Sequence, residues 1–477
     1  METIKETTKD EWNTKESDVN STIEEFKHFI NKAVTPFHTV CAVKEMLEAK
    51  GFKELKMGGE YDIAPGEKYF INVYDSSMLA FTVGAEFNPS SSKECILRCT
   101  SSHTDFPGFK LKSNAKMCLD NINGGCYVKL NTEVYGGPIL NTWMDRPLSI
   151  GGRLIIKGKT VFQSRQLLVD VGKPVLVIPN LAIHMNKDVN KGVELNRQKD
   201  MLPIVAVLTG NGECITETNM NDGINEDRGM NGADILLDVL LKDELAANGI
   251  EKKDVLDYEL YLYSCDKGEQ IGISGEMFSA PRLDNLTSVF AQAKAIINAK
   301  RNDGINVAAF YDNEEIGSRT KQGAASQTMM LILEKIYGAL GCDRNRLIND
   351  VFNGIMISCD VAHATHPNAP EKSDPTNRIM LNKGIVIKQA ANQSYSNDSF
   401  GTAIIRQICE NNHIDYQIFV NRSDMAGGQT LGAISSTVMP FRTIDIGLPL
   451  LAMHSARELM GSADQKKLEK FLTGFYS

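Results

Sequence analysis

The regular alternation of strand-like and helical segments stops after Lys112, and helical spacing returns only near Ala233. Between these points, short β-rich runs such as YVKLNTEVY and GRLIIKG follow one another, separated by Gly, Pro and Asn turns. On both sides of this stretch strands and helices alternate, which is the pattern of an α/β domain. The chain has 477 residues, more than one ordinary hydrophobic core. The sequence therefore predicts an α/β domain with a central mixed sheet, interrupted by an inserted β-rich domain.

The same changes in pattern give the domain boundaries. Residues 1–21 are charged and polar, and we expect a flexible or helical extension there. The following run STIEEFKHFINKA places its apolar residues on one helical face, which starts the folded part of the chain. These residues are Ile23, Phe26, Phe29, Ile30 and Ala33. We assign residues 22–115 and 256–477 to the α/β domain and residues 116–255 to the inserted domain.

Charge and composition exclude several classes of protein. The chain has 51 Lys and Arg against 60 Asp and Glu, a net charge of −9, and no long basic block. This balance argues against nucleic acid or an anionic membrane as the main partner. The N-terminus lacks the apolar core of a signal peptide, and no run reaches the roughly 18 apolar residues of a membrane span. We therefore expect a cytoplasmic protein. Its ten cysteines form no CxxC pairs and several lie inside apolar runs, which favours buried free thiols over disulfides.

The stretch SSHTDFPG places His103 and Asp105 directly after the apolar run CILRC and before a Pro-Gly turn. The residues therefore lie where a buried strand ends. In α/β proteins the loops at the carboxyl ends of strands form ligand sites. On this stretch alone two interpretations stand: a histidine satisfied within its loop, or a metal-binding histidine supported by a carboxylate.

Four further stretches place acidic residues or a histidine at the end of an apolar run. Each has an ordinary explanation, since an Asp before a helix is usually an N-cap, a Glu pair is usually solvated, and a helical His is usually packed. The stretches are SAPRLDN with Asp284, VAAFYDNEEIGS with Glu314 and Glu315, IMISCDVAHATHP with Asp360, His363 and His366, and LLAMHSARE with His454.

Together these residues form a set whose charges balance around two zinc ions. Three carboxylates and one hydroxide offset the four positive charges, and two neutral imidazoles complete a nitrogen and oxygen shell. The carboxylates are Asp284, Glu315 and Asp360, and the imidazoles are His103 and His454. A bridging Asp with one His and one further carboxylate per metal is typical of two-metal hydrolytic sites. Glu314 remains beside a ligand, where it can move a proton from water to a leaving amine.

The combination of motifs closely resembles the aspartyl aminopeptidase family of dinuclear zinc metallopeptidases. The matching blocks occur in family order from about residue 22 to near the end of the chain. They are TPFH, SSHTDFPG, APRLDN, DNEEIGS, DVAHATHPN, GIVIKQAANQSYS and AMHSARE. The resemblance implies a catalytic α/β domain interrupted by a β-rich dimerisation domain. It also implies two zinc ions per subunit, which cobalt or manganese can replace, and a tetrahedral homododecamer built from dimers.

The resemblance assigns roles to individual residues of the catalytic site. Glu314 matches the general base of the family, and Asp105 matches a residue that supports the first metal-binding histidine. The implied metal ligands are His103 and Asp360 for one ion, Glu315 and His454 for the other, and Asp284 as the bridge between them.

The resemblance also implies residues that contact substrate. His363 and Lys388 match positions near the pocket for the first residue of the peptide. His184, in VLVIPNLAIHMNK, matches a histidine that reaches the site of a neighbouring subunit, although by its pattern it is also an ordinary strand-end residue. The family usually has Pro or Cys before glycine where NRSDMAGGQT has Met425 and Ala426. Relatives prefer acidic or neutral N-terminal residues, and this departure leaves the preference open.

These assignments predict removal of single N-terminal residues, acidic or neutral, from peptides. Two zinc ions would activate the attacking water, with Glu314 as general base. A dinuclear carboxypeptidase or amide deacylase is an alternative with the same metal set, and a requirement for a free α-amine would separate these enzymes. A non-catalytic assembly protein of the same fold is a second alternative. The presence of all five ligands and the base argues against it.

Overall fold

The computed structural model describes residues 9–90, 96–122, 125–209, 235–425 and 427–477. It divides into two compact units. The first comprises residues 1–106, 267–453 and 458–477, and the second comprises residues 107–266 and 454–457. The first unit is the α/β unit and the second is the β-rich insertion, so the predicted fold class is confirmed. The domain boundaries at residues 115 and 255 stay predictions; the spatial units change at Pro107 and Lys267.

A nine-stranded mixed sheet forms the centre of the first unit. Its four central strands, β13, β4, β14 and β18, run parallel to one another. In sheet order the strands are β1 (Lys53–Leu55), β2 (Lys68–Val73), β3 (Ser77–Val83), β13 (Ile305–Tyr311), β4 (Leu97–His103), β14 (Ile355–Cys359), β18 (Arg442–Gly447), β16 (Ile385–Gln389) and β17 (Tyr416–Val420).

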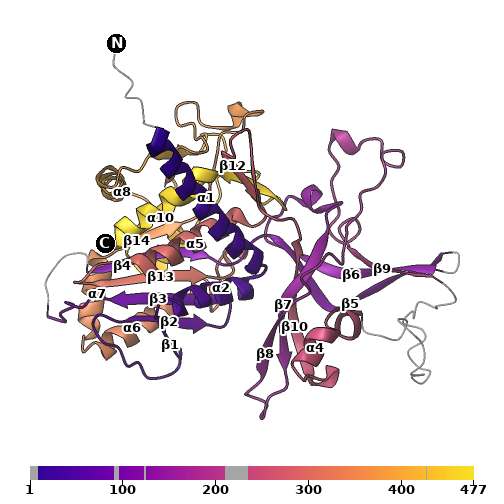
Figure 1. Cartoon of the computed structure of the whole chain (residues 1–477), viewed down its shortest axis with the longest axis horizontal. Helices are drawn as coiled ribbons and strands as arrows, with labels where there is room; N and C mark the ends of the chain where they lie inside the picture. The colour runs from indigo at the N-terminus through magenta and orange to yellow at the C-terminus, as the bar shows by residue number, and fades with distance from the viewer. Residues whose placement is uncertain (1–8, 91–95, 123–124, 210–234, 426) are drawn as a thin grey trace. The chain divides into compact units, whose positions relative to one another are not determined.

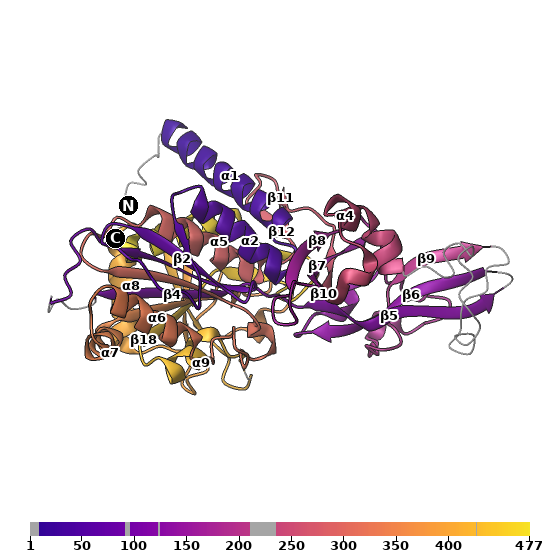
Figure 2. The same ribbon diagram turned by 90° about the horizontal axis from the view of Figure 1, so that it is seen from below.

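Helices cover both faces of this sheet (Figure 1). One face packs against α1 (Lys9–Lys32), α2 (Pro36–Glu48), α5 (Leu283–Asn298), α8 (Ser399–Asn411) and α10 (Ser462–Tyr476). The other packs against α6 (Thr328–Ala339), α7 (Arg344–Asn353) and α9 (Leu431–Val438). Figure 2 shows α1, α2 and α5 on one side of the sheet and α6, α7 and α9 on the other. Because both faces are covered, β13 reads as the continuous apolar run INVAAFY and all its residues are buried.

The predicted helical face near the N-terminus is confirmed. The five apolar residues of STIEEFKHFINKA are all buried in the core between the helices and the sheet. The helix that carries the first four of them begins at Lys9, and Ala33 follows its last residue, so the described part of the predicted N-terminal extension is helical. No helix among the described residues combines the length and apolarity that a membrane crossing requires. All eight described cysteines are free thiols.

A small five-stranded sheet in the first unit leads the chain into α5. Its order is β11 (Glu269–Ile271), β12 (Met277–Ala280), β20 (Glu458–Gly461), β19 (Pro449–Leu451) and β15 (Ala362–His363). β12 pairs antiparallel with β20 and is followed directly by the turn that begins α5. This sheet therefore fixes the start of α5, where Asp284 lies.

The second unit is built on a six-stranded antiparallel sheet. Its order is β8 (Arg165–Asp170), β7 (Leu148–Ile156), β10 (Val255–Ser264), β5 (Gly108–Ile122), β6 (Gly125–Tyr135) and β9 (Ile204–Thr209). A π-helical segment (Ile235–Leu240) and α4 (Lys242–Ala247) pack on the same core. The helical spacing that the sequence indicates near Ala233 belongs to this unit.

Candidate metal centre

The carboxyl ends of the central parallel strands carry the site. His103 is the last residue of β4, and Asp360 follows the last residue of β14. The register pairs His103 with Tyr311, the last residue of β13, and Ser101 with Ser358 of β14. Because these strands are parallel and in register, residues that follow them meet at one edge of the sheet. His103 is 1 % exposed there. A polar side chain buried this deeply needs interaction partners.

Asp284 reaches the same edge from the start of α5. The interpretation of Asp284 as an ordinary helix N-cap is wrong, because Arg282 occupies that position and Asp284 has non-helical backbone angles inside the element. Its backbone N–H donates to the carboxylate of the buried Glu458, 3.0 Å away. The carboxylate of Asp284 is therefore directed inward, with Oδ1 3.5 Å from His103 Nε2.

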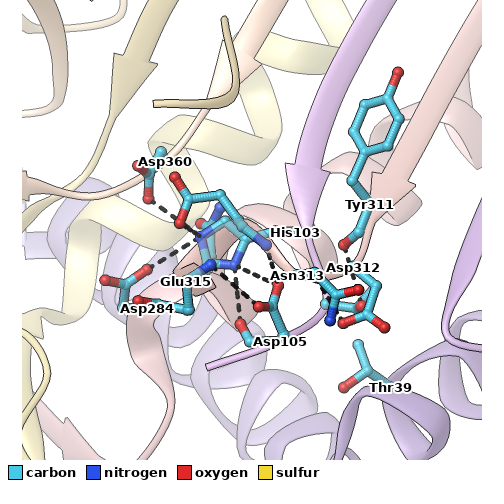
Figure 3. Close-up of polar contacts among 12 residues, drawn as sticks. Thr39, His103, Asp105, Asp284, Tyr311, Asp312, Asn313, Glu315 and Asp360 are labelled. Carbon is cyan, nitrogen blue, oxygen red and sulfur yellow. Dashed lines mark hydrogen bonds and ion pairs between the residues drawn. The ribbon is translucent and has the colours of Figure 1, made fainter. Parts of the chain in front are cut away.

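Three side chains converge closely enough to share one ion. His103, Asp284 and Asp360 each offer a ligand atom, and these atoms lie within 4.8 Å of one another. His103 also groups in this way with Glu314 and Glu315. The separation of His103 Nε2 from Asp360 Oδ1 is 3.7 Å, and that from Glu314 Oε2 is 4.0 Å. Figure 3 shows Asp284, Asp360 and Glu315 gathered around the ring of His103.

Glu314 and Glu315 lie on a single 3-10 turn, Glu314–Ile316, that follows β13. The chain enters the turn through Asn313 with φ +63° and leaves it through Gly317 with φ +96°. The carboxylate of Asp105 holds the turn, since its Oδ1 accepts the N–H of Glu314 at 3.1 Å and its Oδ2 that of Glu315 at 3.2 Å. The turn thus presents both glutamates at the sheet edge.

The ionisation of these groups reflects mutual repulsion in a buried place. Burial raises the pKa of Glu314 to about 8; protonated His103 opposes this shift, and the carboxylates of Asp360, Asp105 and Asp284 add to it. Burial by itself would lower the pKa of His103, but the nearby carboxylates of Asp105, Asp284 and Asp360 raise it well above the usual range. Several buried carboxylates around one imidazole are typical of a site for a divalent cation. The donor set, nitrogen and oxygen atoms only, fits zinc.

Lys388 neutralises part of this charge. The residue is 3 % exposed, and its Nζ lies 3.4 Å from Asp360 Oδ2. Burial would raise the pKa of Asp360, but Lys388 and His103 hold it below its usual value. The Lys388 ammonium also lies 5.3 Å from the centre of the Tyr395 ring. Asp360 is thus shared between His103 on one oxygen and Lys388 on the other.

The three other predicted histidines are described within the unit to which each belongs. His454 belongs to the second unit, where its Nδ1 lies 3.0 Å from the carbonyl oxygen of Gly137. His184, also in the second unit, is exposed in a turn rather than at the end of a strand. His363 is exposed at the end of β15, with its ring 6.2 Å from that of Phe419. Their functional roles stay predictions.

Glu458, which accepts the backbone N–H of Asp284, was not among the predicted residues, although it lies in the run LLAMHSARE with His454. A charged residue at the start of a buried strand could have identified it. In the stretch NRSDMAGGQT, Met425 is 47 % exposed, and Ala426 lies outside the described residues.

The fold and the donor set together define a zinc metallopeptidase. Residues 29–476 match the family model described as Aminopeptidase I zinc metalloprotease (M18). The chain therefore belongs to the M18 family and is a zinc metallo-aminopeptidase.

Relatives of known sequence and structure are similar over nearly the whole chain. A probable M18 family aminopeptidase 2 of Clostridium acetobutylicum is 43% identical over 94% of this chain and 97% of its own length. Aspartyl aminopeptidase 4 of Saccharomyces cerevisiae is 35% identical, covering 95% and 94%. The structure of the S. cerevisiae mApe1 dodecamer has a TM-score of 0.78 at 27% identity, covering 96% of this chain and 97% of the other.

Proposed function

We propose that this aminopeptidase removes single N-terminal residues, acidic or neutral, from peptides, with two zinc ions per subunit and Glu314 as general base. One observation carries the proposal. Ligand atoms of His103, Asp284 and Asp360 lie within 4.8 Å of one another, and the carboxylate of Glu314 lies 4.0 Å from the same imidazole. A cluster of candidate metal ligands with an additional carboxylate beside it suits metal-assisted hydrolysis.

The proposed ligands divide between two ions. The donors are His103 and Asp360 for the first, Glu315 and His454 for the second, and Asp284 as the bridge. When bound, zinc would polarise the scissile carbonyl and acidify a water molecule, and cobalt or manganese can supply the same chemistry. Binding of cations would also lower the pKa of Glu314, because an opposite charge nearby favours the ionised form.

Glu314 would carry the proton. Its carboxylate accepts a proton from the attacking water and then delivers it to the nitrogen of the leaving amine. The site suits this role because Glu314 is largely withdrawn from solvent, and a proton held there is not lost to bulk water.

Lys388 and His363 would contact the first residue of the substrate. Lys388 is the buried cation beside Asp360, so an acidic substrate side chain would compete with that carboxylate for its charge. A neutral side chain would leave the pair intact. The relative named aspartyl aminopeptidase supports acidic substrates, and the altered NRSDMAGGQT stretch leaves neutral ones open.

We expect a free α-amine to be required whichever side chain is preferred. Chromogenic aminoacyl substrates, acidic against neutral, should be cleaved in the presence of zinc, cobalt or manganese, and their N-acetylated forms should be inert. Steady-state rates on matched pairs of free and acetylated substrates check this. Cleavage of acetylated peptides, or release of C-terminal residues, would instead favour the deacylase or carboxypeptidase alternative.

The chain is also proposed to assemble as a homododecamer built from dimers, in the cytoplasm. A solved relative of the same fold is described as a dodecamer, which supports this assembly. In such a particle the second unit would mediate dimerisation, and His184 would reach the metal site of a neighbouring subunit. There its imidazole could hydrogen-bond the oxygen that gains charge during attack.

Shared sites can be tested by complementation. Subunits with only His184→Ala and subunits with only Glu314→Gln should each be nearly inactive, because an oxyanion donor contributes on the order of 10²-fold to turnover. Co-expressed, the two should regain part of the activity, since some sites combine an intact Glu314 with a neighbour's intact His184. The turnover of verified hetero-oligomers is measured against each variant alone. Full activity of His184→Ala alone, or no recovery in hetero-oligomers, would show that the histidine is not shared.

A further inference from the structure

The carboxylate of Asp105 is divided between two backbone amides. Oδ1 accepts the N–H of Glu314 and Oδ2 accepts the N–H of Glu315, at 3.1 and 3.2 Å. Asp105 is fully buried, so no water replaces these bonds. Figure 3 shows Asp105 beside His103 and Glu315. Each oxygen thus accepts a hydrogen bond from a different residue of the same turn.

His103 has a nearer partner than this carboxylate. Its Nδ1 lies 2.9 Å from the main-chain carbonyl oxygen of Asp105 and 3.4 Å from the carboxylate Oδ1. A ring N–H prefers an acceptor within about 3.2 Å. The main-chain oxygen therefore fixes the orientation and tautomer of the imidazole. Every amino acid at position 105 would supply that same oxygen.

The turn that carries the two glutamates needs an outside anchor. The first N–H groups of any helix have no partner within the helix, and Glu314–Ile316 is only three residues long. Asn313, which precedes it, makes no side-chain capping bond to the turn. Asp105 supplies the missing acceptors from a position 209 and 210 residues away in the chain.

We propose that the side chain of Asp105 is a positioning residue for Glu314 and Glu315, and that it is not what orients His103. This inference rests on the proposed function, in which Glu314 is the base and Glu315 a ligand of the second ion. The sequence resemblance assigned Asp105 to the support of His103. The contacts instead indicate that the backbone oxygen of Asp105 orients His103, and that its carboxylate positions Glu314 and Glu315.

Asp105→Ala should therefore weaken metal binding at Glu315 more than metal binding at His103. His103 keeps its carbonyl partner, so the ion shared by His103 and Asp360 should be retained. The ion bound by Glu315 should bind about 10- to 100-fold more weakly, the usual cost of losing an outer-shell partner. With both ions supplied in excess, kcat should fall by about 10²-fold because Glu314 is no longer held, while KM changes less. Asp105→Asn should recover only part of this, since its NH₂ group would face one of the two N–H donors.

The experiment combines site-resolved metal binding with a double-mutant cycle. Anomalous-scattering maps of crystals grown with limiting zinc give the occupancy at each position, independently of activity. In a Glu314→Gln background, Asp105→Ala should lower kcat by less than about threefold, because residues that act through one another are not additive. Asp464→Ala is the matched control: Asp464 is also fully buried and accepts two backbone amides, from Asn382 and Gly384, but lies outside the metal-binding cluster. It should lower the melting temperature without changing the ratio of the two occupancies.

Two results would overturn the inference. If Asp105→Ala lost the ion at His103 before the ion at Glu315, the carboxylate of Asp105 would be what supports the histidine. Fully additive losses of kcat in the double mutant would show that Asp105 does not act through Glu314. A failure of the proposed function looks different: Glu314→Gln alone would keep near-normal turnover, while the occupancies in Asp105→Ala would still report whether the turn is anchored.

Discussion

Replacing Glu314 with glutamine is expected to lower turnover by about 10²- to 10⁴-fold while the fold and the bound metal are kept. Glutamine has nearly the shape of glutamate, so the turn held by Asp105 should persist. Its amide cannot accept the proton of the attacking water. The loss should therefore appear in kcat rather than in metal content or melting temperature.

A second buried glutamate provides the control for this variant. Burial also raises the pKa of Glu469, in α10, to about 7, and this residue lies outside the cluster of candidate ligands. Glu469→Gln should keep near-normal kcat. Rates are measured on purified protein with verified zinc content. Near-normal turnover in Glu314→Gln would mean that another group acts as the base.

Asp284→Ala is expected to lose more metal than His103→Ala. A bridging carboxylate serves both ions, and its loss leaves two divalent cations close together without the charge between them. Removing His103 takes one neutral ligand from one ion. We therefore expect His103→Ala to retain part of its zinc and Asp284→Ala to retain almost none, with activity lost in both.

Elemental analysis of the purified variants decides this comparison. Asp350→Ala is a suitable control, since Asp350 is a buried carboxylate bonded to Tyr337 and Arg346, outside the cluster of candidate ligands. Its loss should affect stability alone. Two equivalents of zinc in Asp284→Ala would be incompatible with a bridging role.

The local pattern of apolar and polar residues predicted several features of the fold and of the candidate site. Apolar spacing identified the buried face of the first helix, and the end of an apolar run placed His103 and Asp360 at strand ends. These features depend on neighbours in the sequence, so periodicity reveals them. The candidate ligands followed from the chemistry that such strand ends share, and from the resemblance.

Features that depend on distant contacts were not predictable in the same way. An Asp before a helix is normally an N-cap, and only the tertiary contact with Glu458 explains why Asp284 instead faces the site. Likewise, spacing within HTD indicates a local partner for His103, whereas the carboxylate of Asp105 is taken by amides more than two hundred residues later. Hydrogen bonds to backbone groups do not depend on residue type, so the sequence does not reveal them.

The position of β13 has a consequence for how the chain is made. β3 and β4 are close in sequence but are separated in the sheet by β13, which is synthesised about two hundred residues after β4. A ribosome that adds about 5–20 residues per second needs on the order of 10–40 s to produce that strand. During this interval the edges of β3 and β4 that face β13 lack their final partner, and such edges can pair with other chains. The insertion leaves the ribosome first and can fold meanwhile, so the catalytic sheet closes only late in synthesis.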